Sequence, residues 1–139
     1  MGITNSTLRN YEEHVGPIER AIRTIKERTR CNYHAMSYHY YPQLMIIGMI
    51  ENVMKWLNAF PSKGGISNTM SPAILLEGKP NPDMNKKHII FGSHAMVFVG
   101  SNNTMSRRSV PAIALNESNE REGHYFMNLY SGKRIHSYE

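Results

Sequence analysis

The chain has 139 residues, the size of one domain or of two very small ones. Its 16 Lys and Arg exceed its 11 Asp and Glu, and the net charge of +5, with His neutral, is compatible with a nucleic-acid or other anionic partner without requiring one. The single cysteine, Cys31, excludes an intramolecular disulfide and a cysteine-based zinc cluster within one chain, and it fits a reducing intracellular setting.

The first predicted element is an amphipathic helix from about Pro17 to Arg30, because a proline suits the first turn of a helix. At about 100° per residue, one mostly apolar stripe of this helix consists of Ile18, Ile22, Ile25 and Thr29. About a quarter turn away lies a charged face that consists of Glu19, Arg23, Lys26 and Arg30. The apolar stripe can pack on a core while the charged face meets a polyanion.

A second helix is predicted from Pro42 to about Phe60, after a packed polar and aromatic loop. It is apolar on most of its circumference, and its solvated stripe consists of Glu51, Lys55 and Asn58. Such a helix needs neighbours on several sides, so we expect part of its surface to lie against an element missing from this chain. Its longest uncharged apolar run, Leu44 to Ile50, is far shorter than the ~20 residues that span a bilayer, so no membrane partner is predicted.

The second half of the sequence predicts a turn-rich connector and a small β domain. Residues 61–85 are rich in Pro, Gly, Ser and Asn, with a short helical piece from Pro72 to Leu76. Five short strands are predicted beyond it, at Ile89–Phe91, His94–Val99, Val110–Leu115, His124–Tyr130 and Lys133–His136. Ser131-Gly132 suits a tight hairpin turn between the last two. The fold class is therefore α+β, with helical residues 1–60, connector residues 61–85 and a small SH3-like barrel over residues 86–139.

Several short motifs occur in an order that resembles one known family. The helix that opens with Gly16-Pro17-Ile18-Glu19-Arg20 resembles the segment of copia-type LTR retrotransposon integrases that carries the last glutamate of their Asp, Asp, Glu triad. Four later segments resemble further landmarks of that family, in the same order. They are Trp56-Leu57-Asn58-Ala59-Phe60-Pro61, Ser71-Pro72, Gly78-Lys79-Pro80 and Phe91-Gly92-Ser93. The resemblance runs from about Val15 to the C-terminus.

The resemblance implies a fold, an activity and a set of site residues. The fold would be the last helices of an RNase-H-like catalytic core followed by an SH3-like domain of the Pol polyprotein. The intact parent would be a nuclear, Mg²⁺-dependent integrase that inserts element DNA into host DNA. Glu19 would be its third catalytic, metal-binding carboxylate, and Arg23 and Lys26 would contact DNA ends, with Arg30 on the same helix face.

The metal site is expected to be incomplete in this chain. Two-metal phosphoryl transfer needs several carboxylates around two Mg²⁺ ions. In the resembling family the two aspartates come from strands far upstream, and this chain starts a few residues before the glutamate helix. The only aspartate, Asp83, lies in the turn-rich connector, and the seven histidines show no repeated ligand pair. We therefore expect the chain alone to be inactive as an enzyme.

A second basic candidate is Arg107-Arg108, in a polar loop between two predicted strands. Loops of small β barrels can contact nucleic-acid backbones, but a charged loop tip is more often only solvated. Phosphate contacts of this kind position a nucleic acid without reading its sequence.

Two other functions stay open from the sequence. One is a non-enzymatic nucleic-acid-binding module, in which the same bases bind phosphates and Glu19 has no metal role. The other is a protein-interaction fragment that associates with itself, or with the missing integrase core, through the apolar second helix. The residues predicted for self-association are Met45, Met49 and Trp56.

Overall fold

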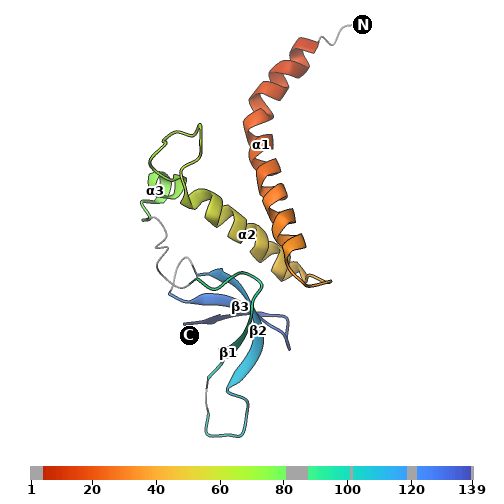
Figure 1. Cartoon of the computed structure of the whole chain (residues 1–139), viewed down its shortest axis with the longest axis vertical. Coiled ribbons are helices and arrows are strands. Elements are labelled where there is room, and N and C mark those ends of the chain that lie inside the picture. Colours follow the sequence, from red (N-terminus) through yellow and green to blue (C-terminus); the bar gives the residue numbers. More distant parts are fainter. Residues whose placement is uncertain (1–4, 81–87, 101, 119–121, 139) are drawn as a thin grey trace.

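The computed structural model describes residues 5–80, 88–100, 102–118 and 122–138, with the side chains of the first helix described from Gly16 onward (Figure 1). The elements in chain order are α1 (Asn5–Ala35), α2 (Gln43–Ala59), α3 (Pro72–Glu77), β1 (His94–Phe98), β2 (Ser109–Glu117), β3 (His124–Asn128) and β4 (Arg134–Ser137). Helices occupy the first half and strands the second, so the predicted α+β class is confirmed.

The first helix is longer than the sequence predicted. α1 starts at Asn5, and Pro17 lies inside it instead of in its first turn, so the predicted start is wrong. A proline inside a helix removes one backbone hydrogen bond and costs about 3 kcal/mol. Because helix formation is cooperative, turns on both sides of such a residue can persist in a 31-residue helix.

The second and third helices are confirmed close to their predicted bounds. α2 follows Pro42, whose backbone is extended, and it ends before Phe60. α3 begins after Ser71, whose hydroxyl accepts a hydrogen bond from the backbone N–H of Ile74. It ends at Gly78, whose φ of 65° is the left-handed conformation typical of a helix C-cap.

The strands form one antiparallel sheet in the order β1-β2-β3-β4, so each strand pairs with its neighbour in sequence. Four of the five predicted strands are confirmed. The strand predicted at Ile89–Phe91 is wrong, because the chain turns there: Gly92 has a φ of 83°. Gly92 and Ser93 nevertheless pair with Ala114 of β2, through N–H···O bonds of 2.8 Å in each direction.

The hydrophobic core lies mainly between α2 and one face of the sheet. Met45 and Met49 of α2 are 1% and 0% exposed, and they pack with Ile113 and Leu115 of β2 and Met127 of β3. A second buried cluster consists of Val97, Ala112, Ala114 and Phe126. Since residues of β2 alternate between the two clusters, both faces of this strand are buried.

The position of Met45 and Met49 corrects the predicted self-association surface. Both side chains are buried inside the chain's own core and offer no surface to a second molecule. Another part of α2 is exposed, and its exposed apolar residues are Ile46, Ile47, Ile50 and Met54. The helical segment and the sheet therefore share one core.

Replacing Met49 with alanine should destabilise the fold by about 2 to 5 kcal/mol, because a fully buried side chain is lost and a cavity remains. Met54→Ala is the matched control, since Met54 lies on the same helix and is 44% exposed. Urea unfolding followed by circular dichroism measures both. Equal losses from the two variants would contradict the core assignment.

Candidate functional site

The charged face of α1 is accessible to solvent. Glu19, Arg23, Lys26 and Arg30 are all exposed. In the part of the chain that the structure describes, no salt bridge engages any of these four side chains. The structure therefore presents the predicted basic residues together, on one side of a helix and free to meet an anion.

Glu19 does not sit in a metal site within the described residues. No group of three or more His, Cys, Asp or Glu side chains in this part of the chain could hold a metal ion. Asp83, the one aspartate, lies outside the described residues. A lone exposed carboxylate four residues from Arg23 does not fit the ligand set that a pair of Mg²⁺ ions requires.

The second predicted basic spot lies far from the first. Arg107 and Arg108 belong to the loop between β1 and β2, which extends from the sheet away from α1 (Figure 1). Arg107 donates a hydrogen bond to the Tyr130 hydroxyl, and its guanidinium lies 5.2 Å from the centre of the Tyr130 ring. Arg107 is thus held against the β3–β4 hairpin, and Arg108 is exposed beside it. The two basic spots do not form one continuous surface.

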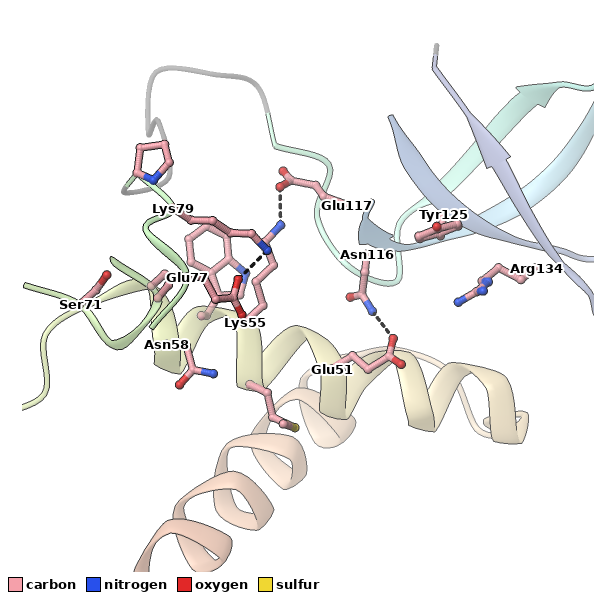
Figure 2. A pocket seen from close by; sticks show the side chains of 15 residues that line it. Glu51, Lys55, Asn58, Ser71, Glu77, Lys79, Asn116, Glu117, Tyr125 and Arg134 are labelled. Atoms are coloured by element: carbon pink, nitrogen blue, oxygen red, sulfur yellow. Dashed lines mark hydrogen bonds and ion pairs between the residues drawn. The ribbon is translucent and has the colours of Figure 1, made fainter. Parts of the chain in front are cut away.

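A cavity of about 680 Å³ lies where α2 and α3 meet the end of β2 (Figure 2). Its lining carries both signs of charge, with Glu51, Glu77 and Glu117 facing Lys55, Lys79 and Arg134. The apolar part of the lining includes Trp56, which stacks on Phe60 and meets the His88 ring edge to face. Trp56, the third residue predicted for self-association, is half-buried in this lining.

The centre of the charged lining is Glu117, at the end of β2. Its carboxylate forms an ion pair with Lys55 of α2 and accepts a hydrogen bond of 2.6 Å from Nδ1 of His88. His124 Nε2 lies 3.8 Å from the same carboxylate. We call this set of four residues the Glu117 junction. It joins α2, the segment before β1, and strands β2 and β3.

The junction shifts the protonation of its members. Burial would raise the pKa of the Glu117 carboxyl, but hydrogen bonds from Lys55 and His88, together with their charges, outweigh it and lower the pKa to about 2. Burial lowers the pKa of His124, and the charge of Glu117 opposes that shift. Glu117 is therefore ionised near neutral pH and does not serve as a proton donor there.

The sequence did not predict this junction. Lys55 and Glu51 were both expected on the solvated stripe of α2; Glu51 is exposed as predicted, whereas Lys55 is partly buried. Lys55 pairs with Glu117, and Glu51 accepts a hydrogen bond of 3.1 Å from the side chain of Asn116. Asn116 also donates to the carbonyl of Gly48 at 3.0 Å. A helical pattern identifies polar positions but cannot show that a strand 62 residues away carries their partners.

No protein-family model, curated protein or solved structure matches this chain. Among the described residues, no helix is both long enough and apolar enough to cross a membrane. Function must therefore be argued from the exposed basic face of α1, the loop at Arg107 and Arg108, and the Glu117 junction.

The pH dependence of stability tests the junction. Because the folded-state pKa of Glu117 lies below its usual value of 4.5, its stabilisation is present above about pH 4.5 and is lost as the pH falls towards 2. Over this pH range we expect the free energy of unfolding of the parent to fall by about 1 kcal/mol more than that of Glu117→Gln, after allowing for screening by solvent. Urea unfolding at a series of pH values measures it.

Glu77→Gln is the control for this measurement, because Glu77 forms an exposed ion pair with Lys79 at 2.6 Å. Its stability should follow that of the parent at every pH. If Glu117→Gln also follows the parent, the junction does not hold a charge that matters to folding.

Proposed function

We propose that this chain is the C-terminal part of a copia-type retrotransposon integrase that contributes DNA contacts through the charged face of α1. Two features support the family. The integrase-like motifs occur in the family's order, from Gly16-Pro17-Ile18-Glu19-Arg20 to Phe91-Gly92-Ser93. The elements also follow the order of the proposed parts: long helices first, then a turn-rich connector, then an antiparallel sheet. In this proposal the helices end an RNase-H-like core, the sheet belongs to an SH3-like domain, and the shared core between α2 and the sheet is the contact between the two parts.

The observation that carries DNA binding is the exposure of Arg23, Lys26 and Arg30 on one helix face without a salt-bridge partner among the described residues. Cations of this kind are free to replace the counterions that surround DNA phosphates. Such contacts position the duplex and carry no sequence information. We therefore expect binding that depends on salt and not on DNA sequence.

Catalysis is proposed only for the intact parent. There Glu19 would be the third metal-binding carboxylate of a nuclear, Mg²⁺-dependent enzyme. This chain contains one aspartate, and its described residues gather no metal-binding group. No step of DNA insertion is assigned to this chain's own residues.

The second candidate is a nucleic-acid-binding module in which Glu19 has no metal role. The isolated position of the Glu19 carboxylate favours it. The two candidates are distinguished by comparing DNA binding of Glu19→Gln and of the parent, with and without Mg²⁺. Stronger DNA binding in Mg²⁺ that depends on Glu19 would support the integrase assignment, and equal behaviour of the two proteins would support the module.

Reversing two charges on the basic face should flatten the salt dependence of DNA binding. Arg23 and Arg30 lie seven residues apart, one above the other on α1. If both contact phosphates, Arg23→Glu/Arg30→Glu should make the slope of log K against log salt shallower by about 2. Fluorescence anisotropy with a short duplex over a salt series measures this slope.

Arg20→Glu/Arg28→Glu is the matched control, because it changes the net charge equally at exposed positions off this face. A control that flattens the slope as much as the test variant would show that only net charge matters. No binding by the parent at low salt would contradict both nucleic-acid proposals.

A further inference from the structure

The apolar stripe of α1 has the spacing of a coiled-coil interface. Ile18, Ile22, Ile25 and Thr29 are separated by steps of four, three and four residues. Alternating steps of this kind place residues at the a and d positions of a seven-residue repeat, which face a partner helix. In the sequence the same spacing continues backward through Val15, Tyr11 and Leu8, and forward to Asn32. We call Ile18, Ile22, Ile25 and Thr29 the α1 seam.

The seam is covered at one end only. From Ile25 to the C-terminus of α1, Ile25, Thr29 and Asn32 are partly buried, and Met36, just beyond the helix, packs against the core. Towards the N-terminus, Ile22 is 46% exposed and Ile18 is 62% exposed. Figure 1 shows why: this half of α1 rises away from the sheet and from α2. The seam therefore runs from a packed contact inside the molecule into an exposed apolar stretch of the same helix.

We propose that a second copy of this chain packs antiparallel on the α1 seam. In this pairing Ile22 of each copy lies opposite Ile25 of the other, and Ile18 lies opposite Thr29. Because the second copy has the same sequence, it presents three isoleucines and the methyl group of a threonine to the seam. The two overlapping segments extend the contact that α1 already makes with α2.

Charge complementarity selects the antiparallel arrangement. Glu19 and Lys26 both occupy the position immediately after a d residue of the seam, on the same flank. In antiparallel helices like flanks meet, so Glu19 of each copy faces Lys26 of the other, and the symmetry makes two ion pairs. In a parallel pair Lys26 would instead face Ala21, and Arg28 would face Tyr33, so within residues 16–35 no acid meets a base.

This interface shares Lys26 with the proposed DNA-binding face but leaves the two arginines of that face outside it. Arg23 and Arg30 lie further round the helix than Lys26, outside the flanks of the seam, so they stay accessible in the dimer. Failure of one proposal leaves the other standing, because dimerisation is measured without DNA and rests on the isoleucines.

Sedimentation equilibrium of the full chain tests the dimer. We expect a concentration-dependent mass that approaches twice 16.0 kDa. Ile22→Asp should abolish the dimer by placing a charge in the seam, while circular dichroism confirms that the sheet persists. A parent that remains monomeric at its highest soluble concentration, or an unchanged dimer in Ile22→Asp, would overturn the proposal.

A charge exchange tests the pairing itself. Glu19→Lys and Lys26→Glu should each weaken dimerisation about tenfold, because each turns two attractions into two repulsions. The double variant Glu19→Lys/Lys26→Glu should restore the parent's affinity. Glu27→Lys and Arg20→Glu make the same charge changes on the outer side of the helix and should leave dimerisation unchanged. Failure of the double variant to recover would overturn the antiparallel pairing.

The single cysteine reports the orientation. Cys31 is exposed and accepts a spin label without any substitution. In the antiparallel dimer Cys31 lies level with Gly16 of the other copy, so the two labels are about 22 Å apart along the helix axis. In a parallel dimer they would lie at the same level. Electron paramagnetic resonance distances distinguish the two, and labels at the same level would overturn the proposal.

Discussion

The contact between α2 and the sheet is the interaction on which the rest of this structure depends. Met45 and Met49 have almost no exposed surface, and their neighbours come from β2 and β3. Burying a methionine side chain contributes about 1.5 to 3 kcal/mol, so a few such residues supply much of the stability of a small domain. The long helix α1 is attached to this core mainly at its C-terminal end, where the Tyr41 hydroxyl donates to the carbonyl of Tyr33 at 2.8 Å.

The Glu117 junction completes the same contact at its polar end. Glu117 follows Leu115 by two residues on the same face of β2, and it pairs with Lys55 of α2, so the strand and helix that pack their apolar residues together are also joined by these charges. Partly buried charges are costly unless they are paired. The pairing explains why the carboxylate stays ionised, and it assigns the junction a structural role beside a cavity whose lining charges largely engage one another.

Local sequence signals predicted most of the elements. Pro42, Ser71-Pro72 and Gly78 mark helix ends, and the alternating strands follow Gly- and Asn-rich turns, so α2, α3 and four strands could be read directly. The errors came where distant residues decide the outcome. Ile89–Phe91 has strand composition but meets Gly92, whose conformation turns the chain beside Met36. The junction was missed because its acid and its base lie on different elements.

The exposed residues of α1 were the most predictable, because an isolated helix takes its faces from sequence alone. That same isolation leaves an apolar stripe, exposed at Ile18 and Ile22, beside an exposed basic face on one helix. An exposed apolar stripe is stabilised by covering it, whereas exposed cations are stabilised well by water. Covering by a partner therefore stabilises the apolar stripe more than it stabilises the basic face. Lys26 alone belongs to both surfaces, and since one ammonium cannot fully serve a phosphate and Glu19 of a second copy, dimerisation would leave DNA binding mainly to Arg23 and Arg30.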